Sequence, residues 1–132
     1  MSIDTIFDLS GKVAVVTGAG SGLGIEFCEV LAEAGADIVA SDVDLAAAEA
    51  TAKRVEGMGR RALAVHCDVS DETQVDEQYR LAVAEFGRVD VLFNNASIAD
   101  PTPQPVHTFP SADWHRVLGV DLHGVFYNCR LR

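Results

Sequence analysis

A glycine-rich turn is the first feature of the sequence that could do chemistry. Residues 17–24 read Thr-Gly-Ala-Gly-Ser-Gly-Leu-Gly and join an apolar run at 12–17 to a helical pattern that starts at Leu23. At such a junction, backbone N–H groups and the helix dipole can hold a pyrophosphate, which larger side chains would obstruct. The spacing differs from the widespread G-x-G-x-x-G pattern. Glycines also allow a helix to pack closely on a strand, so the turn alone leaves both interpretations open.

Asp42 is the second candidate, because it ends the next predicted strand, eighteen residues after Gly24. A carboxylate at this place can accept hydrogen bonds from the ribose hydroxyls of an adenosine. No Lys or Arg stands beside Asp42 or in the glycine turn, so a 2′-phosphate would be repelled and NAD is favoured over NADP. The alternative is a turn or capping role, which Asp44 can already fill.

Two further polar positions follow the third and fourth predicted strands. Asp68 could bind an adenine amino group, and the pair Asn94–Asn95 could bond to backbone across the crevice between the first and fourth strands. Ligands of open α/β sheets bind at the carboxyl ends of the strands, where these residues stand. Ordinary turn chemistry is the alternative for each residue.

Strands and helices alternate along the chain, and this order predicts the elements that position the candidates. Apolar runs predict strands at 12–17, 37–41, 62–67 and 89–93, and helical spacing predicts helices at 23–34, 45–55 and from Ser70 or Asp71 to about Phe86. Crossovers through helices make neighbouring strands parallel, and such crossovers are nearly always right-handed. We therefore expect one α/β domain over 1–132, a doubly wound sheet in three layers, then a proline-rich loop at 99–110 and helices at 111–119 and 120–132.

The composition excludes several classes of protein. The 132 residues carry a net charge of −10, which disfavours nucleic-acid binding. No apolar run reaches 18 residues, so no membrane span is expected, and the start lacks a basic signal region. The three cysteines form no C-x-x-C pair and indicate reduced thiols and a cytoplasmic protein. Metal binding is not expected, because Asp113, His115, Asp121 and His123 follow no ligand motif.

Taken together, TGAGSGLG at 17–24, Asp42, CDVS at 67–70 and NNAS at 94–97 resemble the short-chain dehydrogenase/reductase family, from Gly11 onward. The resemblance implies a Rossmann-like sheet of strand order 3-2-1-4 and hydride transfer between NAD and a small alcohol or ketone. The last helix resembles the family's dimerising helix, which implies a homo-oligomer. By the same likeness the following residues would contact or shape the cofactor site: Gly18, Ser21, Gly22, Leu23, Gly24, Asp42, Asp68, Val69 and Asn95.

The sequence departs from the family pattern in three ways. Ser97 stands where the family usually has glycine, and Asp121 where it has a catalytic asparagine. Asparagine offers both a donor and an acceptor, whereas an ionised aspartate only accepts, so this position lacks the donor that the family's asparagine brings to a proton relay. Neither Tyr79 nor Tyr127 is followed four residues later by the family's lysine, so no catalytic acid or base is assigned.

We therefore expect the chain to be the cofactor-binding half of such an oxidoreductase, truncated at its C-terminal end. The fourth strand would then be an open edge with apolar side chains on both faces. Two alternatives stay open: a non-catalytic module that binds NAD or adenosine, and an inactive truncated fragment.

Overall fold

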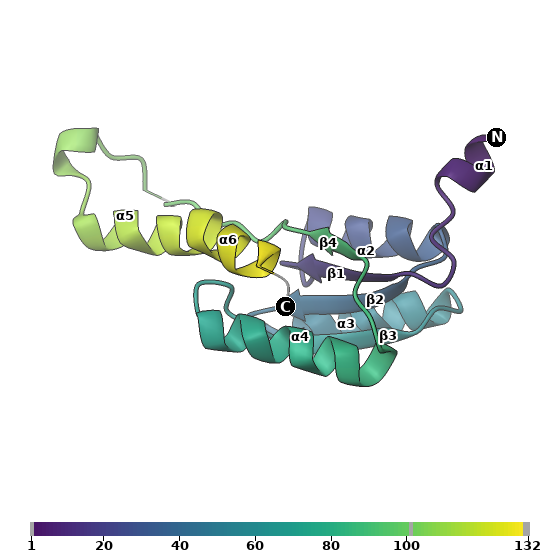
Figure 1. The fold of residues 1–132 in the computed structure, drawn as a ribbon. Helices are drawn as coiled ribbons and strands as arrows, with labels where there is room; N and C mark the ends of the chain where they lie inside the picture. Colours follow the sequence, from purple (N-terminus) through teal and green to yellow (C-terminus); the bar gives the residue numbers. More distant parts are fainter. Residues whose placement is uncertain (1, 101, 131–132) are drawn as a thin grey trace.

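A four-stranded parallel sheet organises the chain. The computed structural model describes residues 2–100 and 102–130 (Figure 1). The strands are β1 (Val13–Thr17), β2 (Asp37–Asp42), β3 (Ala62–His66) and β4 (Val91–Phe93), in the order β3-β2-β1-β4. In register, Val15 of β1 lies between Val39 of β2 and Leu92 of β4. The predicted strand order is confirmed.

Helices cover both faces of this sheet. On one face, buried side chains of α2 (Leu23–Glu33) and α3 (Leu45–Gly57) pack against alternate residues of β1 and β2, such as Val16 and Ile38. On the other face, α4 (Glu72–Phe86) packs on the intervening residues, such as Val15 and Val39. Strands that are apolar on both faces are typical of a parallel sheet between two helical layers. The predicted three-layer α/β fold is confirmed.

Aspartate side chains cap the N-terminal ends of α3 and α4. The side chain of Asp44 accepts a hydrogen bond from the N–H of Ala47 and caps α3. Asp71, rather than Ser70, caps α4, since its carboxylate accepts from the N–H groups of Thr73 and Gln74. Such caps satisfy donors that a helix leaves unpaired at its start.

The fourth strand is shorter than the sequence predicts. We expected 89–93, whereas β4 begins at Val91. The reason is Asp90, whose carboxylate accepts a hydrogen bond of 2.9 Å from the Val13 N–H, while its own N–H donates to the Val13 carbonyl at 2.8 Å. A side chain thus replaces the backbone ladder at the entry to β4. The other strand bounds differ from expectation by one residue at most.

The C-terminal part forms one continuous helical run instead of two separate helices. It comprises α5 (Ser111–Leu118), a π-helical segment η2 (Gly119–His123) and α6 (Gly124–Cys129), and it extends beyond the sheet in Figure 1. Gly119 and Gly124 both adopt helical backbone angles and do not break the run. Residues 131–132 of the predicted helix, and residue 101 of the loop, lie outside the described residues.

Two short elements had no sequence signal that we recognised: the helix α1 (Ile3–Ile6) and the 3₁₀ turn η1 (Val106–Thr108) within the proline-rich loop. Among the helices in the described part of the chain, none has the length and apolar character that crossing a membrane requires.

Candidate functional site

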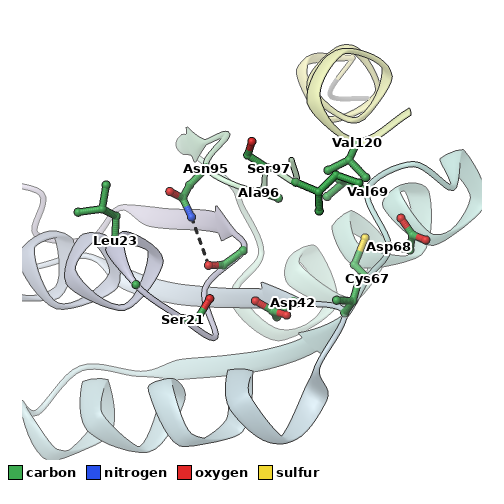
Figure 2. Close-up of a pocket in the computed structure, with 14 residues that line it drawn as sticks. Ser21, Leu23, Asp42, Cys67, Asp68, Val69, Asn95, Ala96, Ser97 and Val120 are labelled. Atoms are coloured by element: carbon green, nitrogen blue, oxygen red, sulfur yellow. Dashed lines mark hydrogen bonds between the residues drawn. The ribbon is translucent and has the colours of Figure 1, made fainter. Parts of the chain in front are cut away.

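A pocket of about 470 Å³ opens at the carboxyl ends of the strands, where the predicted site residues meet (Figure 2). This edge is where ligands bind in open α/β sheets. All four strands contribute through the residues that end or directly follow them. The lining residues are Gly18, Ser21, Gly22, Leu23, Asp42, Val43, Cys67, Asp68, Val69, Asn95, Ala96, Ser97, Ile98 and Val120.

Three of the four glycines in the turn are explained by close packing. A side chain at Gly24 would overlap the carbonyl oxygen of Gly18, and a Cβ at Gly18 would lie 2.9 Å from the Cα of Ala96. A Cβ at Gly20 would lie 2.7 Å from the Cβ of Ala47. Gly24 accordingly packs against the backbone of the turn at Gly18 and is not among the lining residues.

Gly22 is different, because a Cβ added there would meet no atom of residues 2–100 or 102–130 within 4 Å. Its φ of +52° and ψ of −132° are angles that L-residues avoid. No side chain within the described residues caps α2, which starts directly after Gly22, whereas α3 and α4 both have aspartate caps. Free space and uncapped helical N–H groups therefore coincide at the pocket, and this combination suits a phosphate group.

The carboxylate of Asp42 is held by two backbone donors. Its Oδ2 accepts from the Gly20 N–H at 2.8 Å, and its Oδ1 accepts from the Asp44 N–H at 2.9 Å. Asp42 thus has the turn role that the sequence offered as an alternative, and it also lines the pocket. Each carboxylate oxygen can accept a further hydrogen bond, so the two roles are compatible.

Asn95 joins the first and fourth strands across the crevice, as the sequence suggested. Its side-chain N–H₂ donates to the carbonyl oxygens of Thr17 and Gly18 at 3.0 and 3.2 Å, and the bond to Gly18 is visible in Figure 2. The Thr17 hydroxyl accepts from the N–H groups of Asn95 and Ala96 and donates to the Phe93 carbonyl. Asn94 does not take part, since its side chain lies 3.4 Å from the Cys129 sulfur.

The end of β3 supplies a mixed polar and apolar wall. Asp68 Oδ1 accepts from both the backbone N–H and the hydroxyl of Ser70, while Val69 is buried beside it. Cys67 is almost fully buried, and burial raises the pKa of its thiol to about 11, so the thiol is neutral at physiological pH. In the part of the chain that the structure describes, Asp42 and Asp68 are the only charged lining residues.

Asp121 lies in the π-helical segment and reaches the loop that follows β4. Its Oδ1 accepts from the Ile98 N–H at 2.9 Å, and its Oδ2 accepts from the Ser97 hydroxyl at 3.1 Å. Two of the three departures from the family pattern, Ser97 and Asp121, are therefore hydrogen-bonded to each other. The side chain at 121 is engaged in holding the loop.

The structure brings nearly all the predicted residues to one pocket and adds several that we did not predict as ligand contacts. Val43 and Cys67 are neighbours of predicted residues at strand ends, so their positions could have been inferred. Ala96 and Ile98 flank Ser97 in the loop after β4. Val120 comes from the distant helical run, and no local pattern indicates that it lies here. Within the described residues no cluster of three metal-ligating side chains forms.

Comparisons with known proteins agree with this geometry. The sequence profile described as "short chain dehydrogenase" matches residues 12–131. The chain is 46% identical to cis-4-hydroxycyclohexanecarboxylate dehydrogenase of Sinomonas cyclohexanicum, over 86% of this chain and 45% of that protein. It is 38% identical to D-threitol dehydrogenase of Mycolicibacterium smegmatis, over 98% of this chain and 49% of that protein.

Solved structures show the same likeness. The structure of 3-ketoacyl-(acyl-carrier-protein) reductase from Brucella melitensis complexed with NADH superposes with a TM-score of 0.86 at 40% identity, covering 92% of this chain and 49% of that chain. The chain thus spans about half the length of these two curated relatives and of the Brucella reductase.

Proposed function

The chain belongs to the short-chain dehydrogenase family, and from this premise we propose that its pocket binds NAD(H) within an oxidoreductase acting on an alcohol or carbonyl compound. One observation carries the proposal. Gly22 leaves unobstructed space at the uncapped start of α2, while Asp42 lines the same pocket. A pyrophosphate and a ribose diol are the two groups that this pair of features suits.

The proposed arrangement of the cofactor follows from the positions of these residues. Backbone N–H groups at Gly22 and Leu23 hold the pyrophosphate, and Asp42 accepts from the adenosine ribose. Asp68 and Val69 border the adenine, and Asn95 borders the nicotinamide half. When bound, the nicotinamide supplies or accepts the hydride. Asn95 and Thr17 keep the glycine turn and the loop after β4 at a fixed separation through their hydrogen bonds.

We propose NAD rather than NADP as the cofactor. Among the described residues that line the pocket, only Asp42 and Asp68 are charged. A 2′-phosphate on the ribose would meet the carboxylate of Asp42 at short range and find no compensating cation there. The NADH complex of the Brucella relative is consistent with this choice.

The same proposal includes a substrate class, self-association and a cellular location. Two relatives are named as dehydrogenases of hydroxylated small molecules, D-threitol and cis-4-hydroxycyclohexanecarboxylate, and the Brucella relative is named as a 3-ketoacyl reductase. We propose a small alcohol or ketone as substrate, self-association through the exposed helical run, and the cytoplasm as the location.

Binding is tested by titrating the chain with NADH and following the emission of NADH itself. The single tryptophan, Trp114, lies outside the pocket and is a poor reporter. We expect saturable binding that NAD displaces and NADP displaces much less well. A titration without saturation would overturn the proposal.

Hydride transfer needs a separate test, in which NAD reduction is followed with a panel of secondary alcohols. The 132 residues contain no Tyr-x-x-x-Lys sequence, so we expect binding without turnover for this chain. Turnover is expected only from a form of the protein that carries such a segment. Rapid turnover by the 132 residues would show that other groups transfer the proton.

A further inference from the structure

Ser97 and Asp121 form a hydrogen-bonded pair at one side of the pocket. Ser97 is an exposed lining residue, and Figure 2 shows it on the side opposite Asp42. Its hydroxyl lies 3.1 Å from Asp121 Oδ2, and the other carboxylate oxygen accepts from the Ile98 N–H at 2.9 Å. Both oxygens of Asp121 are thus directed at consecutive residues of one loop.

The direction of this hydrogen bond is fixed by chemistry. An ionised carboxylate has no proton to donate, so the shared proton belongs to the Ser97 hydroxyl. A serine hydroxyl has one proton and two lone pairs. With its proton committed to Asp121, Ser97 can offer only a lone pair to a ligand in the pocket.

We propose that Ser97 is a specificity-determining residue that accepts a hydrogen bond from an O–H or N–H group of the ligand. This inference rests on the proposed function, which places the nicotinamide half and the substrate on this side. Two sources can supply such a donor: the carboxamide N–H₂ of the cofactor, or a hydroxyl of the alcohol substrate. A ligand that presents only a carbonyl oxygen to Ser97 is disfavoured.

An asparagine at position 121 would change Ser97 from a hydrogen-bond acceptor into a hydrogen-bond donor toward the ligand. The Ile98 N–H still needs an acceptor, so the amide oxygen faces Ile98 and the amide N–H₂ faces Ser97. The amide then donates to the Ser97 oxygen, and the serine proton becomes free to point at the ligand. The substitution Asp121→Asn should therefore shift the preference of the pocket from donor groups toward acceptor groups, with little change in shape.

The first arm of the test compares NADH with its reduced 3-acetylpyridine analogue, which keeps the carbonyl but lacks the N–H₂ group. If the cofactor supplies the donor, the unmodified chain binds NADH about threefold to tenfold more tightly than the analogue, as one hydrogen bond allows. Asp121→Asn lowers this ratio. In a Ser97→Ala background, the same change at 121 leaves the ratio unaltered.

The second arm uses the chain saturated with NADH and compares binding of 2-butanol and 2-butanone. If the substrate supplies the donor, the alcohol is preferred and Asp121→Asn reduces that preference by a similar factor. Asp113→Asn on α5 is the matched control, since it removes one negative charge from the same helical run without touching Ser97.

The outcomes separate this inference from the proposed function. Absence of NADH binding contradicts the proposed function. Normal NADH binding with donor-to-acceptor ratios that Asp121→Asn leaves unchanged in both arms overturns the role of Ser97. A change in either arm that disappears in the Ser97→Ala background supports it and identifies the source of the donor.

Discussion

At the scale of single residues, Asp42 shows how one carboxylate can be prepared for a ligand before the ligand arrives. Backbone N–H groups of Gly20 and Asp44 hold its two oxygens, so the side chain has little rotational freedom left to lose. Preorganisation of this kind lowers the entropic cost of binding. The same bonds tie the glycine turn to the end of β2.

We predict that Asp42→Ala weakens NADH binding about tenfold or more, since hydrogen bonds to a charged group are lost. Discrimination against NADP should fall as well, because the repelling carboxylate is gone. Competition titrations with both cofactors measure this. Asp44→Ala is the control, since it removes the α3 cap but no lining residue. Equal binding of NADP by the unmodified chain would contradict our assignment of Asp42.

A second residue-scale prediction concerns the buried thiol of Cys28. Burial raises its pKa from 9.0 to about 12. Above pH 9 the unfolded chain loses this proton while the folded chain keeps it, so the unfolded state binds fewer protons and stability falls as pH rises. Between pH 9 and 10 this thiol should cost about 1 kcal/mol of unfolding free energy.

Urea unfolding of Cys28→Ala at pH 8, 9 and 10 measures the effect, and the variant should show the smaller decline with pH. Cys129→Ala is the matched control, because Cys129 is an exposed free thiol. Identical pH slopes for the unmodified chain and Cys28→Ala would refute the prediction.

At the scale of elements, the junction of β1 and α2 explains why the sequence was informative here. Close packing requires glycine at positions 18, 20 and 24. Gly22 is required by its positive φ and lies beside open space, so the spacing of the glycines reflects both packing and ligand access. Asp42, Asp68 and Asn95 could be predicted as neighbours because parallel strands end at one edge of the sheet. The π-helical segment and the position of Val120 depend on long-range packing, which no local pattern encodes.

We predict that Gly22→Ala reduces NADH affinity strongly, because its backbone angles strain an alanine and its methyl group enters the open turn. The strain itself should cost about 1–3 kcal/mol of stability. Gly87→Ala is the matched control: Gly87 also has a positive φ of +79° with no neighbour within 4 Å of a Cβ, but lies at the end of α4. Thermal unfolding and NADH titration distinguish the two effects. An equal loss of affinity in both variants would mean that strain alone is responsible.

At the scale of the whole molecule, the helical run from Ser111 to Cys129 presents an apolar surface to solvent. Trp114, Leu122 and Phe126 are each more than half exposed. The wider turn of the π-helical segment keeps positions four residues apart closer to one line than an α-helix would. An exposed apolar line on a long helix is typical of an interaction surface.

We predict that the chain self-associates through this surface and that Leu122→Ser with Phe126→Ser shifts it toward the monomer in sedimentation velocity. The apolar area removed from water on association is the driving force. Val83→Ser on α4 is the control, since Val83 is also about half exposed but lies on a different helix. A concentration-independent monomer for the unmodified chain would contradict the prediction.

The helical run packs closely against the pocket wall at Gly124, and this contact affects ligand binding indirectly. A Cβ at Gly124 would lie 2.6 Å from the Cγ2 of Val69, a residue of the pocket wall, although Gly124 itself does not line the pocket. A methyl group there would push the helix away from that wall and carry Val120 with it. A loss of ligand binding in Gly124→Ala would therefore come from the displaced helix, although the substituted residue touches no ligand.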